Sequence, residues 1–236
     1  MSVWLEQHKP ELFDELLTST HVIDALKHLA LQANPPHLLL SGPSGCGKTA
    51  ALHLVCRQVL GPSWRATTHV LQARDLDKTS GAMAKFEAFL RPEGAGSEDT
   101  LAGRTSLDAF DHNISASADR SPPPAGEESP APSSGSFAAV SRIIILEDAD
   151  YLGHARQSYL RRMMEESSRS ARFIFTTHTP SRIIEALRSR TQHVRMPSLT
   201  RIMIEQRLES IASVEDLQPA QGVLGDIAHV ASGNLR

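Results

Sequence analysis

One motif constrains the fold of this chain more than any other feature. It fits the pattern G-x-x-x-x-G-K-S/T without a gap and consists of Gly42, Pro43, Ser44, Gly45, Cys46, Gly47, Lys48 and Thr49. An apolar run over residues 38–40 precedes it and a helix-like run over residues 50–60 follows it. Strand, glycine-rich loop and helix in this order predict a phosphate-binding loop, whereas a chance match would be only a glycine-rich turn.

The residue types of this loop suit phosphate chemistry. Its glycines allow successive backbone N–H groups to point into one concavity, and the start of the following helix adds partial positive charge there. Lys48 is expected to reach the β- and γ-phosphates of a nucleotide. The hydroxyl of Thr49 is expected to ligate Mg²⁺.

Composition narrows the class of protein. The chain has 236 residues, 40% of them hydrophobic, and a formal net charge of −3, so any contact with nucleic acid must come from a local basic patch. Its two cysteines, Cys46 and Cys56, match no metal spacing and are expected to be free thiols in a reducing compartment. No apolar run approaches the ~18 residues of a membrane span, so we expect a soluble, intracellular protein with no membrane partner.

Strand-like and helix-like segments alternate along the chain. Strands are expected over residues 37–41, 69–72, 142–146, 172–176 and 192–196, with helices over 50–60, 79–90, 154–166 and 181–187 between them. This alternation predicts an α/β fold in which helices cover both faces of a parallel sheet. Two further helices, over residues 200–213 and 222–231, are expected to form a separate small unit.

The middle of the chain has a different composition. Residues 91–135 are rich in Gly, Ser, Pro, Ala and acidic residues, and residues 121–135 are of low complexity. Because such a segment buries little apolar surface, we expect a disordered insertion over about 91–139 and, by default, a floppy surface loop. The chain is thus divided into a nucleotide-binding domain, residues 1–198, and a partial helical lid domain, residues 199–236.

Acidic residues follow the third predicted strand. Glu147 and Asp148 stand where the buried run over residues 142–146 ends. Three carboxylates within four residues are costly at the end of a core strand unless a cation lies nearby. We therefore expect Glu147 to bind Mg²⁺ together with Thr49 and both acids to serve catalysis, although a solvated turn is the alternative.

Two arginine-containing segments have open interpretations. Arg190, just before the last strand, is a candidate arginine finger for a neighbouring subunit's nucleotide, or simply one more surface arginine. The helix over residues 154–166 carries Arg156, Arg161 and Arg162. These arginines could contact DNA phosphate or an adjacent subunit, or pair with acids four residues later on a solvated face.

Several motifs in a fixed order resemble those of replication factor C small subunits. This family forms the sliding-clamp loader of archaea and eukaryotes, a branch of the AAA+ ATPases. The similar segments are the arm over residues 4–10, the entry to the phosphate loop at 36–43, the helix segment 160–165, the run 181–190, and the end of the chain at 233–236. The resemblance covers most of the chain outside residues 91–139.

The resemblance implies further site residues. Lys9 and Pro10 belong to an arm that lies near the adenine in this family, and Arg236 matches a lid arginine that senses nucleotide. His178 matches a γ-phosphate sensor that is usually Asn, so its protonation becomes pH-dependent. The family usually has D-E-A-D where this chain has Glu147 and then Asp148, which would give Glu147 the metal and Asp148 the attacking water.

The function implied by the resemblance is that of an ATPase subunit of a sliding-clamp loader. Its cofactors would be ATP and Mg²⁺, and its partners other loader subunits, a sliding clamp and primer–template DNA, in archaeal cytoplasm (the nucleoid) or a eukaryotic nucleus. The reversed order of the two acids leaves a hydrolysis-poor scaffold subunit open, and a P-loop small-molecule kinase is a third possibility. Family members continue into a helical collar domain, so either this chain is truncated or its stable assembly is in question.

Overall fold

Strands that are buried on both faces form the centre of the molecule. The computed structural model describes residues 4–77, 81–90, 119, 121–128, 140–166 and 171–235. The five strands pair in parallel in the order β2-β3-β4-β1-β5. They are β1 (Leu38–Ser41), β2 (Thr68–Gln72), β3 (Arg142–Glu147), β4 (Ala171–Thr177) and β5 (Gln192–Arg195). Each predicted strand is present, and its bounds differ from the prediction by one residue at most at either end.

Alternate residues of the strands enter two separate hydrophobic cores. Leu38 and Leu40 belong to one cluster, together with apolar side chains of α2 and α3, whereas Leu39 belongs to the other. In β3, Ile145 belongs to the same cluster as Leu38, and Leu146 belongs to the same cluster as Leu39. Because both faces must be apolar, these strands are continuous hydrophobic runs, which is why they could be predicted.

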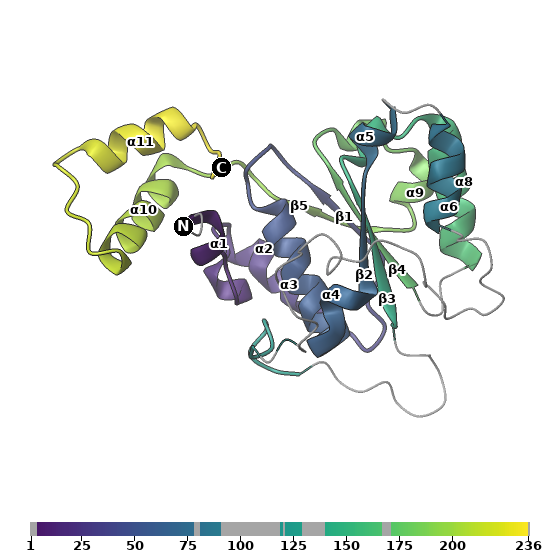
Figure 1. Cartoon of the computed structure of the whole chain (residues 1–236), viewed down its shortest axis with the longest axis horizontal. Helices are drawn as coiled ribbons and strands as arrows, with labels where there is room; N and C mark the ends of the chain where they lie inside the picture. The colour runs from purple at the N-terminus through teal and green to yellow at the C-terminus, as the bar shows by residue number, and fades with distance from the viewer. Residues whose placement is uncertain are drawn as a thin grey trace.

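Helices cover both faces of the sheet, as predicted (Figure 1). One side carries α2 (Thr20–Ala30), α3 (Lys48–Leu60) and α4 (Trp64–Thr67), and the other carries α5 (Ala73–Asp77), α6 (Ala82–Leu90), α8 (His154–Glu166) and α9 (Glu185–Arg188). The arm before α2 contains α1 (Trp4–Gln7) and the 3-10 helix η1 (Phe13–Glu15). Short 3-10 turns complete the ordered parts: η2 (Gly61–Ser63), η3 (Ala149–Tyr151) and η4 (Pro180–Arg182). No helix of these described residues is long and apolar enough to cross a lipid bilayer.

The helix predicted over residues 181–187 is divided in two. Between η4 and α9, Ile183 is extended, with φ −86° and ψ 127°, and is buried. The side chain of Gln157 on α8 accepts a hydrogen bond from Ile184 N (2.8 Å) and donates one to Arg182 O (3.0 Å). A distant side chain thus satisfies backbone groups that a continuous helix would pair internally, so the two short helices form instead.

Part of the predicted disordered insertion is ordered. The prediction of disorder is wrong for residues 121–128, which lie against α3 and η1 with Pro124 buried. Backbone hydrogen bonds and an apolar contact through Ala125 hold these residues, although their composition is polar and proline-rich. The rest of the insertion, including the helical turn expected within residues 105–114, lies outside the described residues.

The last two helices form a small unit beside the sheet domain. α10 (Arg201–Val214) and α11 (Val223–Ala231) pack on each other around Ile204 and Ala228, and Leu17 of the arm packs against this cluster. Thr200 caps α10 by accepting a hydrogen bond from Met203 N. Figure 1 shows both helices to one side of the sheet, next to the N-terminal arm.

Two partly buried histidines make stability depend on pH. Burial lowers the pKa of both His37 and His53 to about 4, helped by Arg172 near His37 and by Arg65 and Lys9 near His53. The ring of His37 also accepts a hydrogen bond from Phe173 N through Nδ1 (3.0 Å), which requires the neutral form. In the unfolded chain both rings recover their ordinary pKa of 6.5, so below that pH the unfolded state binds more protons.

We therefore expect the free energy of unfolding to fall as the pH decreases from 6.5 towards 4. At pH 5 each histidine contributes a loss of about 2 kcal/mol relative to pH 7.5. Urea denaturation of the wild type and of His53→Phe at the two pH values measures this, and the variant should lose less stability on acidification. His28→Gln, which alters an exposed histidine, is the control. Equal acid sensitivity of wild type and His53→Phe would contradict this account of His53.

Candidate functional site

A cavity of about 540 Å³ lies where the carboxyl ends of β1, β3 and β4 meet the N-terminal arm and α10. This edge of a parallel α/β sheet is where ligands usually bind. Most of the predicted site residues line the cavity, although they come from four distant parts of the sequence. These residues are Lys9, Pro10, Ser44, Gly45, Cys46, Gly47, Lys48, Thr49, Glu147, Asp148 and His178.

The loop after β1 has the backbone geometry that its glycines predict. Gly45 and Gly47 have φ values of 72° and 94°, in the left-handed region that other residues rarely adopt. Gly47 precedes the first residue of α3, so the helix begins at Lys48, within the motif. Burial raises the pKa of the Cys46 thiol, which therefore stays protonated at neutral pH. The loop presents backbone amides and a helix start to the cavity, an arrangement suited to anions.

Two side chains at the start of α3, Lys48 and Thr49, donate hydrogen bonds to neighbouring oxygen atoms. Lys48 is largely buried, and its Nζ donates hydrogen bonds to Gly42 O (2.9 Å) and Pro43 O (2.8 Å). The Thr49 hydroxyl donates a hydrogen bond to Glu147 Oε1 at 3.1 Å. The loop and the end of β3 are thus in direct contact, although 98 residues separate Thr49 from Glu147 in the sequence.

The Thr49–Glu147 pair fits one face of a magnesium site. Both groups offer hard oxygen atoms, which Mg²⁺ prefers, and Mg²⁺ usually takes only one or two protein ligands beside water and phosphate. Within the described part of the chain, no group of three or more His, Cys, Asp and Glu side chains could hold a metal by themselves. The two oxygen ligands would leave the remaining positions around a magnesium ion to water and phosphate oxygens.

Asp148 has an unusual backbone conformation and two charged neighbours. Its φ of 53° places it in the left-handed region, and its N–H donates to Thr176 Oγ1 (3.1 Å). Its carboxylate contacts Arg74 Nε through Oδ2 (2.9 Å) and His178 Nε2 through Oδ1 (3.1 Å). A left-handed aspartate held from several sides is typical of a functional position.

His178 is itself fixed by the third carboxylate of this segment. Asp150 Oδ1 accepts a hydrogen bond from Thr177 Oγ1 (2.9 Å) and one from the backbone N–H of His178 (3.3 Å). Asp150 is buried, so it supports the end of β4, and only Glu147 and Asp148 of the three acids line the cavity. Asp148, Asp150 and His178 therefore form one connected group at the edge of the sheet.

The N-terminal arm and the last two helices meet over the cavity. His8 Nε2 lies 2.8 Å from Glu215 Oε1 on the residue after α10, and Arg207 of α10 donates to His8 O (2.6 Å). At the other end of this unit, Leu235 N donates to Gly45 O (3.1 Å). These contacts place the small helical unit directly on the arm and on the glycine-rich loop.

Three predicted residues that the structure describes, Gly42, Pro43 and Arg190, do not line the cavity. Gly42 and Pro43 lie at the start of the loop, where their carbonyls accept hydrogen bonds from Lys48. Arg236 lies outside the described residues. Arg190 lies before β5, whose first residue Gln192 pairs with Leu38 at the start of β1, so Arg190 is at the edge of the sheet opposite to its own loop. Its guanidinium contacts Glu165 Oε1 (2.7 and 3.1 Å) and Ala186 O (2.8 Å).

Sequence reasoning missed several polar residues of the cavity, among them Gln72, Arg74 and Arg207. Arg74 contacts Asp148, Gln72 donates a hydrogen bond to Glu147, and Arg207 reaches the arm. The signal for Gln72 and Arg74 was their position at the end of β2, because the carboxyl ends of parallel strands share one edge. No pattern in the sequence distinguishes Arg207 from other helix arginines.

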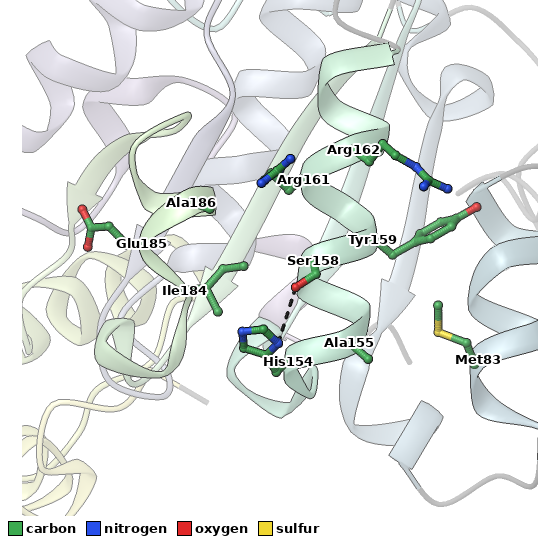
Figure 2. A pocket seen from close by; sticks show the side chains of 10 residues that line it. All are labelled: Met83, His154, Ala155, Ser158, Tyr159, Arg161, Arg162, Ile184, Glu185 and Ala186. Carbon is green, nitrogen blue, oxygen red and sulfur yellow. Dashed lines mark hydrogen bonds between the residues drawn. The ribbon is translucent and has the colours of Figure 1, made fainter.

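A second hollow lies along α8, between α6 and α9, with a volume of about 700 Å³. Figure 2 shows Arg161 on the side of α9 and Arg162 near Tyr159. The guanidinium of Arg162 lies 5.8 Å from the centre of the Tyr159 ring. Arg161 also pairs with the glutamate four residues later at 3.7 Å. The hollow is separate from the cavity at the glycine-rich loop, and it combines basic side chains with an aromatic ring.

Two family models match parts of this chain. The model described as Rad17 P-loop domain matches residues 1–94, which contain the glycine-rich loop. The model described as DNA polymerase III, delta subunit, matches residues 131–200, which contain the two acids and Arg190. Together they cover both flanks of the segment with unusual composition.

Curated relatives match almost the whole chain. The replication factor C small subunit of Methanothermobacter thermautotrophicus is 30% identical over 99% of this chain and 60% of the relative. That of Aeropyrum pernix is 28% identical over 99% of this chain and 59% of the relative. Replication factor C subunit 2 of Phaeosphaeria nodorum is 29% identical over 99% of this chain and 53% of the relative. The chain thus spans somewhat more than half the length of these relatives.

Solved structures show the same fold. The Thermotoga maritima RuvB Holliday junction branch migration motor superposes with a TM-score of 0.61 at 16% identity, covering 96% of this chain and 61% of that chain. A variant of the same RuvB gives a TM-score of 0.63 at 16% identity, with the same coverage. The predicted α/β P-loop AAA+ fold is confirmed, and so is the resemblance to replication factor C small subunits.

Proposed function

Starting from the similarity to replication factor C small subunits, we propose that this chain is an ATP-dependent subunit of a DNA sliding-clamp loader. One observation carries the nucleotide-binding part of the proposal. The loop hydroxyl of Thr49 and the strand-end carboxylate of Glu147 are 3.1 Å apart in a cavity that also contains Lys48. The triphosphate would contact the loop, and Mg²⁺ would contact the Thr49–Glu147 pair. The adenine would contact the arm that contains Lys9 and Pro10.

Each group of the cavity has a role in this proposal. Lys48 would leave the carbonyls of Gly42 and Pro43 and pair with the β- and γ-phosphate oxygens, which are stronger acceptors. Mg²⁺ bound beside Thr49 and Glu147 would neutralise developing charge on the phosphates. His178 would donate a hydrogen bond to the γ-phosphate, and Arg236 would do so from the lid.

Hydrolysis requires a base for the attacking water, and Asp148 is the residue that we assign to it. The water oxygen bonds to the γ-phosphorus, the bond from phosphorus to the β–γ bridging oxygen breaks, and the proton passes to the carboxylate. Both oxygens of Asp148 are engaged, by Arg74 and by His178. Each carboxylate oxygen keeps a second lone pair, so Asp148 can accept the proton where these contacts leave the water access to it.

The same contacts favour a second candidate function, a hydrolysis-poor scaffold subunit of the same loader. If Arg74 and His178 hold Asp148 permanently, the chain would bind nucleotide and support its neighbours without rapid turnover. A small-molecule kinase is less well supported, because curated relatives that match 99% of the chain are clamp-loader subunits.

The place of Arg190 supports a role on a neighbouring subunit. It lies at the sheet edge opposite to its own cavity, so it could only reach a nucleotide bound by another chain. Its pairing with Glu165 would have to open for this contact. The hollow along α8, with Arg161 and Arg162, is the surface that we assign to primer–template DNA phosphates or to an adjacent subunit.

Arg190→Ala in the assembled loader tests this function. We expect ATP turnover at the neighbouring site to fall by roughly a thousandfold, with nucleotide affinity of the Arg190 chain itself unchanged. Arg188→Ala is the matched control. Arg188 lies two residues before Arg190 and pairs with Glu185. Clamp loading on primed DNA and steady-state hydrolysis are measured together. Full turnover and loading with Arg190→Ala would exclude the proposed trans contact.

A further inference from the structure

We propose that residues 121–128, hereafter the docked segment, act as an internal ligand that fixes one wall of the nucleotide cavity. The segment binds α3 and η1 and thereby positions the arm over residues 9–17. The effect on nucleotide affinity rests on the proposed function, whereas the effect on the arm itself does not.

The first observation is a built peptide site on α3. Gln58 is 5% exposed, and both ends of its side-chain amide bind the backbone of the docked segment. Its Oε1 accepts from Ala125 N (2.9 Å), and its Nε2 donates to Glu127 O (2.9 Å). Without the segment, this buried amide would lose these two hydrogen bonds, which costs more than the loss of exposed ones. The segment therefore contributes to satisfying a buried polar group.

The composition of the segment suits this site. Three consecutive prolines, Pro122 to Pro124, have no N–H donors to satisfy, and their rings restrict φ before docking. The entropic cost of docking is correspondingly small. Pro124 is buried, and Ala125 packs against the core cluster that contains Phe13. Low hydrophobicity therefore does not prevent this segment from binding.

A second anchor lies just before the segment. Asp119 Oδ2 accepts a hydrogen bond from the indole Nε1 of Trp64 (2.9 Å), and Asp119 N donates to Pro62 O (3.0 Å). Its Oδ1 accepts from Ser121 N (3.0 Å). The entry to the segment is thus tied to η2 and to α4, independently of Gln58.

The docked segment is bonded directly to the arm. Phe13 N donates to Pro124 O at 3.1 Å. Arg57 Nη2 donates to Pro122 O (3.3 Å) and also to Glu11 O, so it bridges segment and arm. Phe13 is completely buried beneath these contacts.

The other side of the same arm forms the cavity wall. Pro10, Glu15, Leu16 and Leu17 line the cavity, on either side of the residues that bond to the docked segment. The segment itself does not line the cavity. It therefore acts through the position of the arm, and Gln58 is a positioning residue rather than a catalytic one.

Two variants test this inference. Gln58→Ala removes the side-chain amide that bonds to Ala125 N and Glu127 O. Replacement of residues 121–128 by four Gly-Ser repeats removes the prolines and the buried contacts at constant length. Hydrogen exchange of the amides over residues 11–17 should become about tenfold faster in both variants. Affinity for Mg·ATP should fall by about three- to tenfold, because the arm must then be ordered on binding. Glu128→Ala, an exposed change at the end of the segment, is the control and should alter neither quantity.

The readouts separate the possible failures. Unchanged exchange in the arm, with unchanged affinity, would overturn the inference. Uniformly faster exchange over β1, β3 and β4 by the same factor would also overturn it, because the segment would then stabilise only the whole fold. If wild type bound no nucleotide, the proposed function would fail, and exchange in the arm would still decide whether the segment positions it.

Discussion

Replacing Lys48 by Ala is expected to weaken Mg·ATP binding by more than about a hundredfold. The ammonium group lies at the mouth of the loop, close to the two carbonyls that it contacts in the free site. Charge-assisted hydrogen bonds contribute about 1.5–3 kcal/mol each, and Lys48 is expected to bond two phosphates. Titration with a fluorescent ATP analogue measures the dissociation constant.

The control for this prediction is Lys27→Ala. Lys27 pairs with Asp14 on the surface and does not line the cavity, so its loss removes the same charge without touching the site. Wild-type affinity is expected for this control, and unchanged thermal stability of Lys48→Ala would show that the loss is local. Binding by Lys48→Ala within about threefold of wild type would contradict the proposed role of the loop.

Asp148→Asn is expected to reduce ATP turnover by about a hundredfold or more while leaving Mg·ATP affinity within a few-fold of wild type. An amide accepts no proton from water, and a positioned base typically contributes factors of about 10² to 10⁴. Binding is expected to survive, because the Thr49–Glu147 contact does not involve Asp148. Single-turnover hydrolysis in the assembled loader separates the chemical step from nucleotide binding.

The outcome of Asp148→Asn also decides between the two loader functions. Asp24→Asn, which removes an exposed carboxylate from α2, controls for the change in charge. If Asp148→Asn hydrolyses ATP as fast as wild type, Asp148 is not the base, and the hydrolysis-poor scaffold becomes the better description. That result would agree with the contacts from Arg74 and His178, which already occupy both carboxylate oxygens.

The sheet and the main site could be predicted because each leaves a local signature. Strands such as β1 and β3 are buried on both faces and so contain continuous apolar runs. The loop after β1 needs glycine at two left-handed positions, Gly45 and Gly47, which gives it a recognisable spacing. The parallel topology then brings Glu147 to Thr49 without any further information from the sequence.

The features that were missed depend on contacts between distant residues. Residues 121–128 have the composition of a disordered loop, and their hydrogen-bond partners, which include Gln58, Arg57 and Phe13, lie more than 60 residues earlier in the sequence. Gln157 divides a predicted helix through two hydrogen bonds to the chain 25 and 27 residues later. Arg74 and Arg207 belong to no local pattern, because their partners lie in other elements.

The central claim is that the cavity at the carboxyl ends of β1, β3 and β4 binds a magnesium nucleotide. Isothermal titration calorimetry of the wild-type chain with ATP, in magnesium and then in excess EDTA, tests this claim most directly. We predict one binding event per chain with a micromolar dissociation constant that is weakened by at least about tenfold when magnesium is removed. Folded protein that releases no heat with Mg·ATP, alone or together with its partner subunits, would contradict the claim.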